Sequence, residues 1–212
     1  MIKFSSNEIR DLFISFFVIS LAFTILYSRS DLSDFSTIVK LLPMVMVGVG
    51  LGFILHELAH KVIAMRYGYW AEFKTWTPGL FFALISPFLG FIFAAPGAVY
   101  IYGDYMSDKE NGIISLFGPL TNIILAFIFF LLYFVTLTST VLGIIQSKWI
   151  IEVLITTFIL GFSINSFLAL FNLLPVSILD GAKIFRWDPL IWLAIFAIAG
   201  VMVFLGFTGI LF

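Results

Sequence analysis

The chain has 212 residues, of which 62% are hydrophobic and only 11% are charged, and its formal net charge is −1. Soluble domains carry about a quarter charged residues, so this composition excludes an ordinary soluble domain and is typical of a multi-spanning membrane protein. The low net charge without a basic run argues against a nucleic-acid partner. Cysteine is absent, which excludes disulfides and thiolate metal ligands.

Six apolar stretches follow one another along the chain, and each approaches or exceeds the roughly 20 residues that a helix needs to cross a bilayer. No soluble second domain is indicated, because the longest polar interval, Gly103–Gly112, is too short to fold alone. The sequence therefore predicts an all-α polytopic membrane protein with about five to six transmembrane helices. The stretches are Leu12–Tyr27, Leu41–Met65, Gly79–Tyr102, Ile113–Leu137, Trp149–Leu174 and Pro189–Phe212.

The third stretch differs from the others, because glycines and prolines interrupt it and a β-favouring run, Ala98–Tyr102, ends it. Suppose that residues 79–102 dip into the membrane and return to the same side, with the amino terminus in the cytoplasm. Eight basic residues then lie inside and three outside, whereas a crossing stretch gives six and five. The positive-inside rule therefore favours a re-entrant, partly β segment. Lys61 and Arg66, two of the eight, are expected to extend their charges into the membrane interface.

Both histidines of the chain lie in the second stretch, in the sequence His56-Glu57-Leu58-Ala59-His60. Residues four apart in a helix lie one turn apart on the same face, so both imidazoles can reach one metal ion. Glu57 can hold and deprotonate a metal-bound water. If Leu41 marks the outer membrane boundary, His56 lies about 7–8 Å below the cytoplasmic edge, where water can reach it. The motif therefore predicts a metal site.

A third protein ligand has to be a carboxylate, because the chain has no Cys and no further His. Asp180 is the best candidate. It follows an apolar stretch broken at Asn172-Leu173-Leu174-Pro175 and precedes Gly181, an arrangement that can turn a short segment back into the membrane from the cytoplasmic side. The re-entrant topology puts Asp180 on the same side as His56, whereas a crossing third stretch puts it on the opposite side.

These motifs resemble those of the site-2 proteases, which are intramembrane zinc metalloproteases. The residues His56–His60 resemble the first zinc motif of that family, and Asn172–Pro175 with Asp180-Gly181 resembles the second. Gly118-Pro119-Leu120-Thr121-Asn122 resembles a motif often found on the intervening helix. The similarity is to a short form without a PDZ domain.

The resemblance implies a single transmembrane protease domain over residues 1–212, with a catalytic core at about 41–181 and peripheral helices at about 11–27 and 189–212. It implies hydrolysis of a peptide bond within or near the transmembrane segment of a membrane-protein substrate, as in regulated intramembrane proteolysis. One zinc ion per chain is expected. The implied roles are zinc binding by His56, His60 and Asp180, acid and base catalysis by Glu57, and holding of the substrate backbone or oxyanion by Asn172.

Three polar residues inside other stretches are open to a packing interpretation. Asn122 could orient Asn172 or the substrate, or it could serve only as a polar contact between helices. Ser163 and Asn165 are interpreted as helix-packing contacts.

An unwound substrate segment needs a partner, since a helical peptide bond is shielded by its own hydrogen bonds. Residues 94–103 could receive it by β-augmentation, with Val99 and Ile101 as the pairing residues. Alternatively, this segment only walls the cavity.

Two other functions compete with this hypothesis. A membrane metalloprotease of another family, acting in quality control, needs a Glu as third ligand, and the chain offers only the poorly placed Glu72. A metal-ion transporter generally shows internal repeats and several intramembrane polar positions, which are not visible here. The expected location is the cell membrane, with the amino terminus and the active-site opening on the cytoplasmic side. The expected partners are the lipid bilayer and a transmembrane-helix protein substrate.

Overall fold

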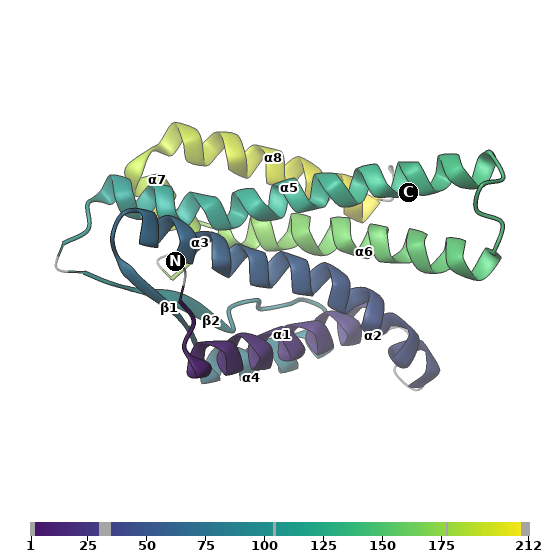
Figure 1. Ribbon diagram of the computed structural model, residues 1–212, viewed down its shortest axis with the longest axis horizontal. Coiled ribbons are helices and arrows are strands. Elements are labelled where there is room, and N and C mark those ends of the chain that lie inside the picture. Colours follow the sequence, from purple (N-terminus) through teal and green to yellow (C-terminus); the bar gives the residue numbers. More distant parts are fainter. Residues whose placement is uncertain (1–2, 30–34, 104, 177, 209–212) are drawn as a thin grey trace.

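The computed structural model describes residues 3–29, 35–103, 105–176 and 178–208. It is a bundle of helices with a small sheet toward one end, on the left in Figure 1. The helices are α1 (Ser6–Tyr27), α2 (Phe35–Val49), the π-helix η2 (Gly50–Ile54), α3 (Leu55–Arg66), α4 (Thr77–Ile85), the 3-10 helix η3 (Ser86–Leu89), α5 (Asp108–Val141), α6 (Lys148–Asn172), α7 (Asp180–Trp187) and α8 (Pro189–Thr208). Helix α5 is central, because it packs against α3, α6 and α7.

Five helices in the described part are long and apolar enough to cross a membrane, which confirms the predicted all-α polytopic fold. Three of them begin several residues before the apolar stretches that predicted them, and in α1 and α5 a polar cap marks the start. Ser5 caps α1 by accepting the Glu8 N–H, and Ser107 forms a capping box with Glu110 at the start of α5. Polar residues thus start these helices before the hydropathy rises. The last four residues of the predicted final helix, 209–212, lie outside the described residues.

The second span is one helical rod, Phe35–Arg66, made of α2, η2 and α3. The π-helical turn lies in its middle and contains Gly50 and Gly52. It ends at Ile54, shortly before His56, which is the second residue of α3. Such turns inside α-helices are rare and are frequently found at functional sites. The backbone is therefore irregular immediately before the predicted metal motif.

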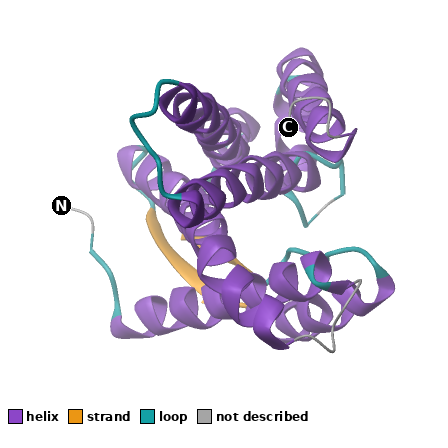
Figure 2. Cartoon of the chain, turned by 90° about the vertical axis from the view of Figure 1, so that its right-hand side faces the viewer, coloured by secondary structure: helices purple, strands orange, loops and turns teal. Residues whose placement is uncertain are grey.

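The third predicted stretch does not form a spanning helix. It contains α4, η3 and the strand β2 (Gly97–Tyr102), which pairs antiparallel with β1 (Trp70–Thr75). Because Thr75 pairs with Gly97, the chain returns beside the point at which it left, as expected of a re-entrant segment. Figure 2 shows how small this sheet is beside the helices. The sequence did not predict β1, although its buried Ala71 and Phe73 follow the alternation of a strand.

The outer edge of β1 is covered by carboxylates from α1. The Phe73 N–H donates to Glu8 Oε1 over 3.1 Å, and the Thr75 N–H donates to Asp11 Oδ2 over 3.2 Å. These amides point away from β2, so Phe73 and Thr75 occupy non-hydrogen-bonded pairs of the ladder. Val99, the partner of Phe73, must then also point its N–H and C=O away from β1. The outer edge of β2 is therefore the one that neither α1 nor another strand of the described part covers, and its Val99 N–H faces Glu57.

Lys61 forms a buried ion pair with Glu8, so the expectation that it extends into the membrane interface is wrong. Its Nζ lies 2.7 Å from Glu8 Oε1, and both side chains are 1% exposed. The pair joins the amino-terminal turn of α1 to the helix that carries the histidines. A buried charge is tolerated when a partner and further hydrogen bonds satisfy it, and Glu8 additionally accepts the Phe73 N–H.

Lys61→Met is expected to lower the free energy of unfolding by about 3–5 kcal/mol, because it leaves the Glu8 charge buried and unpaired. Chemical unfolding in detergent measures this loss. The double variant Glu8→Gln/Lys61→Met should recover part of the stability, since the substituted glutamine side chain is neutral and still accepts the Phe73 N–H. The exposed Lys109→Met is the control and should unfold like the parent chain. Equal stability of the Lys61 and Lys109 variants would contradict the ion pair.

Candidate metal centre and active site

Helix α3 places both histidines on the face that packs against α5. His56 and His60 are buried, and their Nε2 atoms lie 3.0 Å apart. Their rings meet edge to face, with centroids 4.7 Å apart. The four-residue spacing thus produces the shared face that the sequence predicted.

Asp180 reaches the histidines because α7 packs against α5, the helix that also contacts α3, and begins beside the end of α6. Helix α6 ends at Asn172, and α7 begins at Asp180. The next residue, Gly181, makes the turn-back close: a Cβ there would lie 2.1 Å from the Leu173 carbonyl oxygen. Only glycine permits this contact, so the Asp-Gly pair serves both ligand placement and packing.

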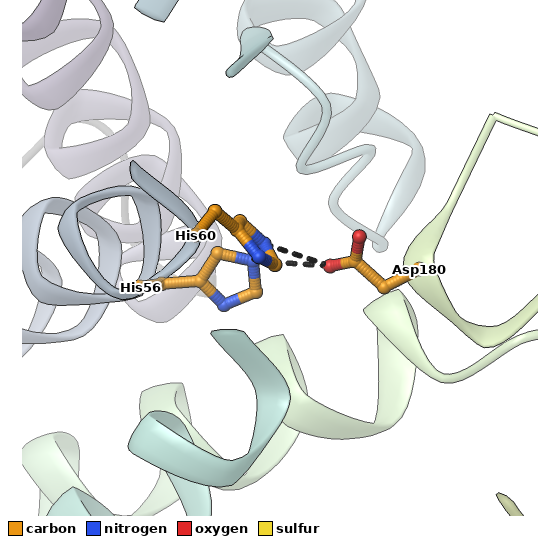
Figure 3. Close-up of side chains that lie close together, drawn as sticks. All are labelled: His56, His60 and Asp180. Carbon is orange, nitrogen blue, oxygen red and sulfur yellow. Dashed lines mark hydrogen bonds and ion pairs between the residues drawn. The ribbon is translucent and has the colours of Figure 1, made fainter. Parts of the chain in front are cut away.

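The three side chains converge on one point (Figure 3). Asp180 Oδ2 lies 3.3 Å from His56 Nε2 and 3.1 Å from His60 Nε2. In a tetrahedral zinc site with bonds of about 2.0–2.2 Å, neighbouring ligand atoms are about 3.3–3.5 Å apart. The nitrogen and oxygen atoms are therefore spaced nearly as zinc ligands are.

Hydrogen bonds on the far side of each ring favour the tautomer that binds metal. His56 Nδ1 lies 2.6 Å from Asn122 Oδ1, and His60 Nδ1 lies 2.8 Å from the Ile114 carbonyl oxygen. Both partners are acceptors, so each Nδ1 carries the proton and each Nε2 carries a lone pair. Two lone pairs and a carboxylate oxygen then face one another without an N–H or O–H between them. A cation satisfies this arrangement, so the residues fit a metal ion.

Gly118 gives the imidazoles room. A Cβ at this position on α5 would lie 2.4 Å from His60 Nε2 and 2.6 Å from His56 Nε2. The glycine therefore keeps space open directly beside the two ligand atoms. In the Gly118–Asn122 motif, the glycine leaves space for the imidazoles and the asparagine accepts a hydrogen bond from His56.

Glu57 lies beside the three converging side chains and keeps one carboxylate oxygen without a hydrogen-bond partner in the described part of the chain. The side chain is buried, and its Oε2 has no hydrogen-bond partner among the described residues. Its electrostatic neighbours include His56, Asp180, Lys183 and the backbone N–H of Val99. A carboxylate so placed can accept a proton from a water molecule next to the metal ligands.

A cavity of about 80 Å³ is lined by Glu57, by the candidate metal ligands and by other predicted site residues. Asn172 lines it, and the amide nitrogen of Asn172 uses one N–H for the Leu168 carbonyl oxygen, 3.0 Å away, which leaves a second N–H. Val99 and Ile101 line the cavity from β2. Asn122 is different, because it is fully buried behind His56.

Lys183 is a charged residue of the site that the sequence did not single out. It lies one turn after Asp180 in α7, and its Nζ is 3.4 Å from Asp180 Oδ1. Burial raises the pKa of Asp180, whereas the Lys183 ammonium lowers it. The ammonium group therefore favours the ionised carboxylate that a metal ligand needs. The i, i+3 spacing from Asp180 was the available signal.

Gly118→Ala is expected to weaken zinc binding at least about tenfold, because the new Cβ displaces the imidazoles from positions that a metal site needs to within about 0.5 Å. Zinc affinity is measured by competition with a chelator. Gly200→Ala is the matched control, since a Cβ at Gly200 meets no atom within 4 Å. Unchanged zinc affinity of the Gly118 variant would contradict the steric role.

The sequence is similar to those of known proteins. The model of the family described as peptidase family M50 matches residues 44–188, which include His56, His60, Asp180 and Glu57. A protein of Methanocaldococcus jannaschii, provisionally named a zinc metalloprotease, is 44% identical over 191 residues, which are 90% of this chain and 89% of that protein. No solved structure matches. The chain therefore belongs to peptidase family M50, the site-2 protease family, and is a membrane-embedded zinc metallopeptidase.

Proposed function

We propose that the protein hydrolyses a peptide bond within or near the transmembrane segment of a membrane-protein substrate. The convergence of His56, His60 and Asp180 beside the unpartnered Glu57 oxygen carries this proposal. His56 and Glu57 lie on a helix that is long and apolar enough to span the membrane, so the reacting groups lie where a substrate helix would be. Regulated intramembrane proteolysis is the kind of process that such a site serves.

In this proposal His56, His60 and Asp180 hold one zinc ion per chain. When bound, zinc polarises a water molecule and the scissile carbonyl group. Glu57 accepts the water proton on a carboxylate oxygen and passes it to the nitrogen of the leaving amine. Asn172 holds the substrate backbone or the oxyanion with its remaining N–H. Asn122 keeps His56 in its metal-binding tautomer.

The edge of β2 receives the unwound substrate in this proposal. Its Val99 and Ile101 belong to pairs that direct their backbone groups away from β1, and both residues line the cavity beside Glu57. An extended peptide could add to this edge as a third strand. The carboxylates of Glu8 and Asp11 cover the opposite edge, which supports β2 as the receiving strand.

The whole chain acts as one protease domain in the cell membrane, with the amino terminus and the cavity opening toward the cytoplasm. The charge distribution supports this orientation, since eight of eleven basic residues then lie inside.

Glu57→Ala is expected to keep bound zinc and to lose cleavage by about 10²–10⁴-fold, because the general base is gone while all three ligands remain. Asp180→Asn is expected to weaken zinc binding. Metal analysis of the purified chain and cleavage of a single-span model substrate in vesicles measure the two effects. The control is Glu152→Ala, an exposed carboxylate at the far end of α6, which should change neither. Normal cleavage by the Glu57 variant would refute the mechanism.

Val99→Pro is expected to abolish cleavage and to leave zinc content unchanged, and Ile101→Pro should behave alike. Proline removes an N–H that β1 does not use, so an edge strand can tolerate it. Because the Val99 N–H also faces Glu57, the Ile101 variant is the one that isolates strand pairing. Val99→Ala is the matched control, because it shortens the side chain and keeps the N–H. Cleavage that is equal in the two Val99 variants would show that strand pairing is not used, and loss of zinc in Val99→Pro would indicate a folding role.

A further inference from the structure

We propose that Asn165 on α6 is a positioning residue for His56, acting through Asn122. Asn165 fixes the orientation of the Asn122 amide, and that orientation selects the imidazole tautomer whose Nε2 can bind metal. The inference rests on the proposed metal site. It adds Asn165 as the residue behind Asn122, which itself lies behind His56. It also assigns a specific role to a residue that the sequence suggested only as a packing contact.

The orientation of Asn165 is determined by two backbone carbonyls. Its side chain is fully buried, and its Nδ2 donates to the carbonyl oxygens of Gly161, 2.8 Å away, and of Gly48, 3.2 Å away. Both amide protons are thus used on α6 and α2. The Oδ1 atom has to point the other way, toward Asn122.

The orientation of Asn122 follows from that of Asn165. Its Nδ2 donates to Asn165 Oδ1 over 3.1 Å and to the Gly52 carbonyl oxygen over 3.0 Å. Its Oδ1 is then the atom that faces His56 Nδ1 at 2.6 Å. If the amide were reversed, its NH₂ group would face the ring. Nδ1 would then hold the lone pair and Nε2 the proton, which blocks metal binding.

The backbone around Asn165 is shaped for these bonds. A Cβ at Gly52 would lie 2.6 Å from Asn165 Oδ1, and a Cβ at Gly48 would lie 3.2 Å from the Cα of Gly161. Glycines thus allow α6 to approach the second span closely, and Gly52 belongs to the π-helical turn before His56. Each N–H and each amide oxygen of the two asparagines has a partner, which an apolar surrounding requires.

The first test measures zinc affinity without substrate, by chelator competition. Asn165→Leu removes the acceptor for Asn122 and is expected to weaken zinc binding about 10–100-fold, as loss of an outer-shell partner does. Thr157→Val is the matched control on the same helix. Thr157 is buried and donates to the Val153 carbonyl oxygen over 2.7 Å, with no link to the histidines. This control should leave zinc affinity unchanged, and Asn165→Ala replaces the leucine variant if the larger side chain prevents folding.

The second test separates positioning from packing by using an Asn122→Asp background. A carboxylate presents an oxygen to His56 Nδ1 in either orientation, so it no longer needs Asn165 to orient it. Asn165→Leu should therefore cause no further loss of zinc affinity in that background. An equal loss in both backgrounds overturns the inference, because it would mean that Asn165 acts by packing alone.

His56→Ala separates failure of this inference from failure of the proposed function. It should abolish zinc binding if the metal site is as proposed, and zinc retained by this variant overturns the metal site and the inference with it. If His56→Ala loses zinc while Asn165→Leu binds it normally, only the positioning role is overturned.

Discussion

Two imidazole lone pairs and a carboxylate meet in the interior of an apolar helix bundle, and much of the architecture exists to bring them there. Without a cation, these groups would repel one another in a medium that screens charge poorly. Helix α3 supplies two of them through a four-residue spacing. The third comes from α7, which is turned back against α6 by a glycine contact. Helix α5 stands between them and supplies both space and hydrogen bonds.

Local sequence rules were sufficient for the spans and for the residues that converge as candidate metal ligands. The histidine spacing is a property of one helix, and hydropathy finds long apolar helices without knowing their neighbours. Asp180 could be predicted for a different reason. The chain has so few possible metal-ligand residues that excluding the poorly placed ones leaves one good candidate. The structure then brought this residue within 3.3 Å of both histidines. Scarcity of polar residues, which usually limits inference from sequence, was informative here.

The remaining features depend on which distant segments become neighbours, and no local rule supplies that information. Lys61 was expected at the membrane interface, because nothing near it in the sequence shows that Glu8, 53 residues earlier, lies beside it. Asn165 bonds to a carbonyl 117 residues away, so it could be interpreted only as a generic packing residue. Strand β1 exists because β2 and α1 complete its hydrogen bonds, and its polar composition gave little sign of it.

The covered edge of β1 has a consequence for how copies of the protein behave next to one another. Unpaired strand edges are templates on which a second chain can join, and they promote aggregation. In the described sheet, acidic side chains of α1 occupy one such edge, and the other faces an internal cavity. The described sheet therefore exposes no row of backbone amides to which a strand of a neighbouring copy could add. The proposed pairing of β2 with a substrate is thus compatible with a sheet that offers little template for self-association.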